Sequence, residues 1–280
     1  MVYCVDVLER DVPCVLDPVF LSPLYEVLRQ GHSSLVFLAG DSTLDNKYWF
    51  HDSDAAINGY ELILSPANMK LDVNYWINAE LVKRGLKNWA CINTAVEASS
   101  LNSRSCGDLL PQDEFIRDHI CEDDVLIVSV GGNDIALNPV LFTILNIIPL
   151  VCCTPLCMLE HASCACPPNL QVDMGCCGCG LDGCLAGTLC GFPLGMGYFV
   201  NLFKNRVENY IARLVHKCKP RKVLVCMLYY PDQGQPDQKF FTFLSDQFPC
   251  LVGRGGWADC ALAAMGYNLA PERLRQARQA

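Results

Sequence analysis

The sequence predicts an α/β protein with three α/β/α layers around a parallel sheet. Apolar runs such as Leu35–Ala39 and Val125–Val130 lack helical spacing of polar residues and end in glycine-bearing turns, as buried parallel strands do. Segments with helical spacing alternate with these runs, which is the pattern of a parallel sheet with right-handed crossovers. At 280 residues the chain can bury a substantial core, and we expect one domain over residues 1–280.

Each expected element follows from a local pattern. Glycines after helical spacing predict two helix ends, at Gly31 and Gly85, and continuous apolar runs predict the strands. In chain order, the expected elements are a helix at Pro18–Gln30, a first strand from Leu35, a helix at Asp72–Arg84, a second strand at Trp89–Asn93, a helix at Asp108–His119, a third strand from Val125, a helix at Tyr198–Cys218, a fourth strand from Lys222, and helices at Trp257–Met265 and from Pro271.

Charge and composition exclude some classes of partner. A net charge of −9 argues against nucleic acid and against anionic membrane surfaces as electrostatic partners. The N-terminal residues 1–13 contain four charged residues where a signal peptide would need an apolar region, so no secretory targeting is expected. We therefore expect a cytoplasmic, reducing location, in which most of the 19 cysteines are thiols or metal ligands.

Two polar turns follow the first and third strands. The first contains Gly40, Asp41 and Ser42, and the second contains Gly131–Asp134. Carboxyl ends of parallel strands share one edge of a sheet, where ligands bind in open α/β folds. A serine hydroxyl there can act as a nucleophile if a base takes its proton, and the Asn133 amide could stabilise the oxyanion that forms. The alternative is that Ser42 is an ordinary turn or helix-capping serine.

These two blocks resemble the SGNH (GDSL-type) serine hydrolase family. The family has Gly-Asp-Ser after its first strand and Gly-x-Asn-Asp after its third, and both are present in order, within Gly40–Asn46 and at Gly131–Asp134. The resemblance implies a flavodoxin-like SGNH hydrolase fold with strand order 2-1-3-4, and with the fifth, edge strand missing from this chain.

The resemblance also implies roles for individual residues. Ser42 would be the nucleophile, and Asn133 and the backbone N–H of Ala98 would form the oxyanion hole. Ala98 stands where the family has a glycine, so the hole requires a negative φ at this residue. Gly40 and Gly132 belong to the motifs, and Asp41, Asp45 and Asp134 would brace the turns.

The catalytic base is not identified. In the family it is a histidine in a D-x-x-H block after the last strand, and none of the five histidines (His32, His51, His119, His161 and His216) lies in such a block. His32 and His119 precede strands, while His51 and His161 are the two that a loop could bring to the serine. The chain ends as its last helix begins, which suggests a truncated product of a longer hydrolase.

A cysteine-rich apolar insertion is expected at residues 150–192. Ten cysteines lie between Cys152 and Cys190, and uncharged runs cover residues 135–159 and 183–203. Each run is long enough to span a bilayer, but prolines and glycines interrupt both. Three interpretations stay open: a buried or lid-like insertion, a membrane-associated hairpin within residues 135–203 acylated at Cys152 and Cys153, or a metal site.

The expected function is hydrolysis of carboxylic esters, with acyl lipids as one candidate class, through an acyl-serine at Ser42. Without the histidine block the activity would be weak, because an oxyanion hole and binding alone supply roughly 10³–10⁴-fold catalysis over water. We expect a small-molecule ester as the partner, no cofactor and no metal in this site. The alternative is a non-catalytic relic of the hydrolase fold that binds a ligand.

Overall fold

The computed structural model describes residues 2–3, 18–45, 52–104, 109–136, 141–167 and 188–226. Contacts divide the chain into two units. Unit 1 is Met1–Asn133 with Glu208–Met227, and unit 2 is Asp134–Val207 with Leu228–Ala280. The elements of unit 1 are β1 (Val2–Tyr3), α1 (Pro18–Gly31), β2 (Ser34–Gly40), β3 (Ser53–Ala55), η1 (Tyr60–Leu62), β4 (Leu64–Ser65), β5 (Asn68–Lys70), α2 (Val73–Lys83), β6 (Trp89–Asn93), η2 (Asn102–Arg104), α3 (Pro111–His119), β7 (Val125–Ser129), most of α9 (Val207–Leu214) and β10 (Lys222–Val225).

Unit 1 contains the predicted parallel sheet. Its four strands lie in the order β10-β7-β2-β6, and all three neighbouring pairs are parallel. With the strands numbered as they occur in the sequence, this is the order 2-1-3-4 that the resemblance implied. The register pairs Val36 with Cys91 and Gly40 with Ser129, so the ends of β2 and β7 meet at one edge, which we call the carboxyl edge.

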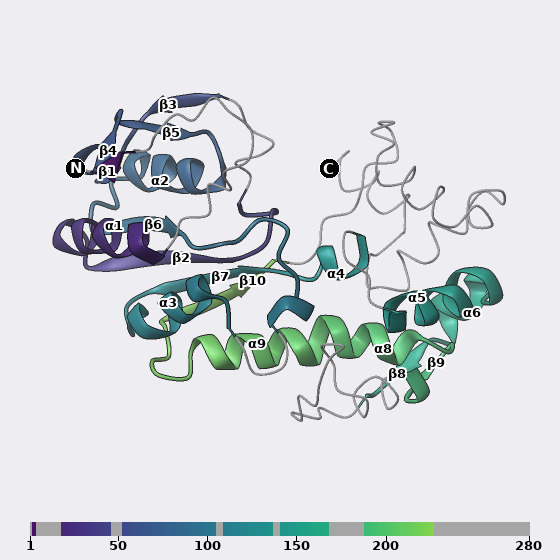
Figure 1. Cartoon of the computed structure of the whole chain (residues 1–280). Coiled ribbons are helices and arrows are strands. Elements are labelled where there is room, and N and C mark those ends of the chain that lie inside the picture. Colours follow the sequence, from purple (N-terminus) through teal and green to yellow (C-terminus); the bar gives the residue numbers. More distant parts are fainter. Residues whose placement is uncertain are drawn as a thin grey trace. The chain divides into compact units, whose positions relative to one another are not determined.

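Helices cover both faces of this sheet, as Figure 1 shows for α2 and α3. All seven residues of β2 are buried, and successive side chains of a strand point to opposite faces. Val36 and Leu38 belong to an apolar cluster that packs against Val73 and Ile77 of α2. Phe37 points to the other face, where its ring lies 6.5 Å from that of Tyr25 in α1.

The α1 helix also contacts α3 on that face, where the rings of Tyr25 and Phe115 lie 5.7 Å apart. The α/β class with a parallel sheet and helices on both faces is therefore confirmed. The helix predicted at Asp72–Arg84 is α2, with Asp72 accepting a hydrogen bond from the Tyr75 N–H as its N-cap. Gly85 follows this helix with a φ of +68°, a left-handed conformation that suits glycine.

A side chain forms hydrogen bonds with part of one outer edge of the sheet, that of β6. Asn78 of α2 accepts a hydrogen bond from the Cys91 N–H at 2.9 Å and donates one to the Cys91 carbonyl at 3.1 Å. An unpaired strand edge is a template for association with other chains, and the amide occupies part of the edge of β6 in place of another strand.

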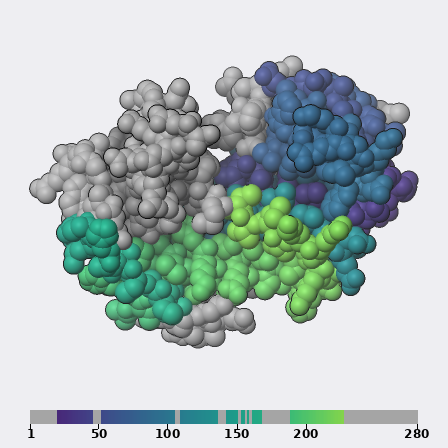
Figure 2. Space-filling view, turned by 180° about the vertical axis from the view of Figure 1, so that it is seen from behind, coloured from purple at the N-terminus to yellow at the C-terminus, as the bar shows by residue number. Residues whose placement is uncertain are grey.

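The opposite edge of the described sheet is β10. The chain around this strand, yellow-green in Figure 2, lies on the surface, and Leu224 and Val225 are 42% and 48% exposed. The predicted fourth strand is therefore confirmed over Lys222–Val225. The helices expected beyond it, at Trp257–Met265 and from Pro271, lie outside the described residues.

Unit 2 holds the segment between β7 and α9. Its elements are α4 (Asn133–Ala136, which begins in unit 1), α5 (Leu141–Ile148), a π-helical turn η3 (Pro149–Cys153), α6 (Leu156–His161), β8 (Cys164–Ala165), β9 (Gly191–Phe192), α8 (Met196–Val200) and a second π-helical segment η4 (Asn201–Arg206). Helical backbone thus runs through most of the range predicted at Tyr198–Cys218.

The insertion expected at residues 150–192 falls within unit 2, and 20 of its residues, 168–187, are outside the described part. Cys153, one of the two expected acylation sites, is exposed. In the described ranges, every helix is too short or too polar to cross a bilayer. Membrane association through residues 135–203 stays a prediction.

Candidate functional site

The site begins where β2 ends against β7. Gly40 has a φ of +154°, and a Cβ atom built on it would lie 2.0 Å from the Ser129 carbonyl oxygen. No residue with a side chain fits at this distance, so the close approach of the two strands requires glycine. The next residue continues the contact, since the Asp41 N–H donates to the same carbonyl at 3.2 Å.

A tight turn after Gly40 holds Ser42. The Asp41 carboxylate accepts a hydrogen bond from the Thr43 N–H at 3.0 Å, and the Asp41 carbonyl accepts from the N–H groups of Leu44 and Asp45, both at 3.0 Å. The Thr43 hydroxyl donates to the Ser129 hydroxyl at 2.7 Å. Ser42 lies in the middle of this turn and is half-buried. Its backbone is therefore fixed on both sides.

Asp41 itself is buried, with 1% of its surface exposed. Its Oδ2 atom has no hydrogen-bond partner among the described residues. Burial raises the pKa of this carboxyl above its ordinary value, although the hydrogen bond from Thr43 and the charge of Arg104 act in the opposite direction. The residue next to the candidate nucleophile is thus a buried acid that holds its proton more tightly than an exposed aspartate.

The loop after β6 packs onto this turn. The Asn93 amide donates to the Leu44 carbonyl at 3.1 Å, and buried Asp45 accepts a hydrogen bond from the Glu97 N–H at 3.0 Å. Asp45 therefore connects the serine turn to the loop after β6. Asn46, the last residue of the extended motif, lies outside the described residues.

Ala98 differs from the expectation. Its φ is +57°, whereas the predicted oxyanion hole required a negative value. The left-handed region is costly for a residue with a Cβ atom and is normally occupied by glycine. The loop contacts on either side of Ala98 impose the conformation, and the condition under which the Ala98 N–H could serve the oxyanion hole is not met.

The turn after β7 supplies Asn133. Gly131 has a φ of +106°, and Gly132 and Asn133 are half-buried at the start of α4. The Asn133 side-chain amide donates a hydrogen bond to the Ser99 carbonyl at 2.8 Å. Asp134, the last residue of the motif, is completely buried and belongs to unit 2.

Ser99 joins the two turns. Its hydroxyl lies 2.6 Å from the Val96 carbonyl and 3.2 Å from the Gly40 carbonyl, while its own carbonyl accepts from Asn133. The residues predicted from the two motifs are thus connected at the carboxyl edge through a single intermediate residue. Sequence reasoning missed Ser99, because a serine in a polar loop has no local signal that distinguishes it.

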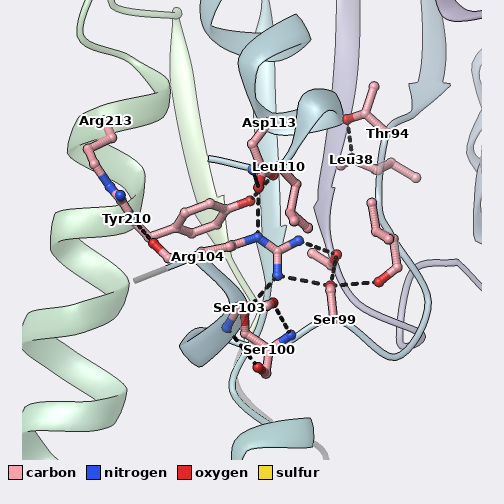
Figure 3. A network of polar contacts seen from close by, with 12 residues as sticks. Leu38, Thr94, Ser99, Ser100, Ser103, Arg104, Leu110, Asp113, Tyr210 and Arg213 are labelled. Carbon is pink, nitrogen blue, oxygen red and sulfur yellow. Dashed lines mark hydrogen bonds and ion pairs between the residues drawn. The ribbon is translucent and has the colours of Figure 1, made fainter. Parts of the chain in front are cut away.

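A buried arginine holds this arrangement together (Figure 3). Arg104 is completely buried and forms an ion pair with Asp113 of α3 at 2.8 Å. It also donates to the Ser99 hydroxyl at 2.9 Å and to the Gly40 carbonyl at 2.9 Å. The Tyr210 hydroxyl of α9 donates to the other oxygen of Asp113 at 2.6 Å. One guanidinium therefore links β2, the loop after β6, α3 and α9.

The described histidines of unit 1 lie away from the carboxyl edge. His32, His119 and His216 each precede a strand, and the ring nitrogens of the first two lie 2.9 Å and 2.8 Å from the carbonyls of Leu28 and Phe115. His161 is exposed at the end of α6 in unit 2, and His51 lies outside the described residues. The described part of unit 1 therefore places no histidine beside Ser42.

No group of three or more histidine, cysteine, aspartate or glutamate side chains in the described ranges is arranged to hold a metal ion. Comparison with protein-family models, with curated proteins and with solved structures finds no match to this chain.

Proposed function

We propose that this chain is a serine hydrolase of the SGNH (GDSL) type that cleaves carboxylic esters through an acyl-serine at Ser42. The observation that carries the proposal is the link Gly40–Ser99–Asn133, which connects the serine turn and the asparagine turn at the carboxyl edge. The strand order agrees with the flavodoxin-like SGNH fold that the motifs imply.

The left-handed φ of Ala98 also supports this proposal. The family has glycine at this position, and the loop keeps a backbone conformation that favours glycine although the residue is alanine. This preference for glycine at the position where the family has one supports the proposal from a third loop.

In the proposed reaction, the Ser42 oxygen attacks the ester carbonyl carbon, and the carbonyl oxygen becomes an oxyanion. An N–H of the Asn133 amide would donate a hydrogen bond to this oxyanion, which lowers the barrier because charge develops there. Collapse expels the alcohol and leaves an acyl-serine, and water then releases the acid. Acyl lipids fit as one class of substrate, since unit 2 contains long apolar runs.

The proton of Ser42 needs an acceptor, and no described histidine of unit 1 is placed to accept it. We therefore propose a weak esterase, within roughly the 10³–10⁴-fold over water that binding and oxyanion stabilisation supply. The same observation favours the second candidate, a hydrolase-fold protein that binds an acyl or ester ligand without turning it over.

A fluorophosphonate probe separates the two candidates, because it reacts covalently only with an activated serine. We expect the purified protein to be labelled and the Ser42→Ala variant to remain unlabelled. Ser33→Ala is the matched control, since Ser33 is an exposed serine before β2 at the opposite end of the sheet. Absence of labelling, beside a control hydrolase that reacts, would favour the binding protein. Labelling that persists in Ser42→Ala would reject Ser42 as the nucleophile.

A further inference from the structure

Unit 2 contains an antiparallel strand pair with one cysteine within it and two directly beside it. Cys164 of β8 pairs with Phe192 of β9, and Ala165 pairs with Gly191. The ladder continues by one residue, because the Cys166 N–H donates to the Cys190 carbonyl at 3.1 Å. Cys166 and Cys190 are therefore directly opposite each other at the end of the pair.

The two faces of this pair differ. A Cβ atom on Gly191 would lie 2.4 Å from the Gly197 nitrogen of α8 and 3.1 Å from the Cβ atom of Ala165, so this face packs against the helix. Alternate residues of a strand point to opposite faces, which directs Cys164, Cys166 and Cys190 away from α8. All three cysteines are exposed and their thiols are free.

We propose that Cys166 and Cys190 form a reversible disulfide across the two strands. Directly opposite, hydrogen-bonded residues of an antiparallel pair have Cα atoms about 5.5 Å apart and side chains on the same face. This separation lies within the range of roughly 4.4–6.8 Å that disulfides require. The backbone thus places the two thiols opposite each other on one face of the pair, and a small local adjustment brings their Cβ atoms to the roughly 3.5–4.5 Å that a disulfide needs.

Cys164 is the competing partner, and the register disfavours it. It lies opposite Phe192, so its relation to Cys190 is diagonal, at about 7–8 Å. That distance exceeds the usual range for a disulfide. A metal ion held by these thiols is the other alternative, but the described residues form no group of three suitable ligands.

The oxidant is a small-molecule disulfide such as glutathione disulfide. One cysteine thiolate attacks a glutathione sulfur, which forms a mixed disulfide and releases one glutathione thiolate. The second cysteine thiolate then attacks the protein sulfur of the mixed disulfide and releases the second glutathione. Two protein thiols lose two electrons and two protons, and one glutathione disulfide becomes two glutathione molecules. Excess reduced glutathione reverses both steps.

The test is peptide mapping of the full chain after incubation with glutathione disulfide and blocking of the remaining thiols with a maleimide. Trypsin combined with a protease that cuts after acidic residues separates the partners into peptides 161–173 and 183–204. We expect these peptides to be joined, with fragmentation assigning the bond to Cys166 and Cys190. Reduced glutathione should separate them. Cys190→Ser should abolish the link, whereas Cys157→Ser, an exposed cysteine of the same unit, should leave it intact.

Three results would overturn the proposal. The first is that peptides 161–173 and 183–204 stay separate while other cysteines of the chain are oxidised. The second is that the bond maps to Cys164. The third is that the thiols resist the maleimide until a chelator is added, which would show that a metal ion holds them.

Discussion

At the scale of single residues, Ala98 occupies a conformation that its side chain disfavours. Its φ of +57° costs an L-residue about 1–2 kcal/mol relative to the right-handed region. Among the described residues, only Asn58 shares a positive φ without being glycine, and asparagine tolerates it better. The strain lies in the loop that connects the serine turn and the asparagine turn through Ser99.

Replacing Ala98 with glycine should therefore stabilise the protein. We predict an increase in the free energy of unfolding of up to about 1 kcal/mol, since relief of strain exceeds the extra backbone entropy of glycine in the unfolded chain. Urea unfolding measures the change. Ala55→Gly is the control, because Ala55 is also exposed but has a negative φ in β3, and it should lower stability by about 0.5–1 kcal/mol. Equal effects of the two substitutions would contradict the assignment of strain to Ala98.

Arg104 illustrates the cost of removing one member of a buried network. Arg104→Met would leave the Asp113 carboxylate buried and without its ion partner, and we predict a loss of about 3–5 kcal/mol in the free energy of unfolding. The exposed pair Lys83–Glu80 provides the control, since Lys83→Met should change stability by about 0.5 kcal/mol or less. Denaturation of both variants in urea gives the comparison. The double variant Arg104→Met/Asp113→Asn should lose less than the sum of its single changes, and full additivity would mean that the two residues do not interact.

The buried carboxyl of Asp41 predicts a pH dependence. Burial raises its pKa in the folded protein above the ordinary value of 3.8, so the folded state binds the proton more tightly than the unfolded chain. The resulting stability is fully present below the unfolded pKa and is lost as the pH rises through the folded pKa. We predict that the stability of the wild type relative to Asp41→Asn falls as the pH rises above the ordinary pKa of 3.8. Urea unfolding at several pH values in this range tests the sign, and a constant difference between the two proteins would contradict it.

At the scale of elements, β2 and β7 depend on a close contact at their ends. Gly40→Ala places a Cβ atom 2.0 Å from the Ser129 carbonyl oxygen, and backbone must move to accept it. We predict a loss of about 3 kcal/mol, the upper end for overpacked sites, measured by thermal or urea unfolding. Gly31→Ala is the matched control at the end of α1, where the added Cβ would meet nothing within 4 Å. A Gly40→Ala variant as stable as Gly31→Ala would show that the strands are further apart than described.

The positions of the four strands of the parallel sheet could be predicted from the sequence because each is a continuous, largely apolar run, whereas the two- and three-residue strands β1, β3, β4, β5, β8 and β9 were not predicted. The second strand, Trp89–Asn93, has the predicted bounds, and the first, third and fourth begin at or within one residue of the predicted positions. The helix at Asp108–His119 begins later, at Pro111, because proline is favoured in the first turn of a helix.

Contacts between distant residues could not be predicted in this way. Asn78 pairs with the Cys91 backbone, and Arg104 pairs with the Gly40 carbonyl. Both contacts depend on how the elements pack, and neither Asn78 nor Arg104 belongs to a recognisable motif. The sign of φ at Ala98, which the sequence left as a condition for the oxyanion hole, could not be predicted for the same reason. A preference of alanine for negative φ was outweighed by the contacts of Asp45 with Glu97 and of Ser99 with Val96.

At the scale of the whole molecule, the chain combines a discontinuous sheet unit with a second unit entered directly after Asn133. The candidate site is built within unit 1, from three segments that end or follow β2, β6 and β7. The apolar and cysteine-rich part of the sequence belongs to unit 2. This division lets the redox proposal for Cys166 and Cys190 be tested independently of the hydrolase proposal for Ser42.

The central claim is that Ser42 and Asn133 act on the same bound atom. Its most direct test is the second-order rate constant for fluorophosphonate labelling of Ser42 in the wild type and in Asn133→Ala, with folding of both confirmed by circular dichroism. Loss of an oxyanion donor should slow the reaction by about 10²-fold or more, and Asn133→Asp, which keeps the size but not the donor, should be slowed at least as much. Labelling of Ser42 at an unchanged rate in both variants would contradict the claim.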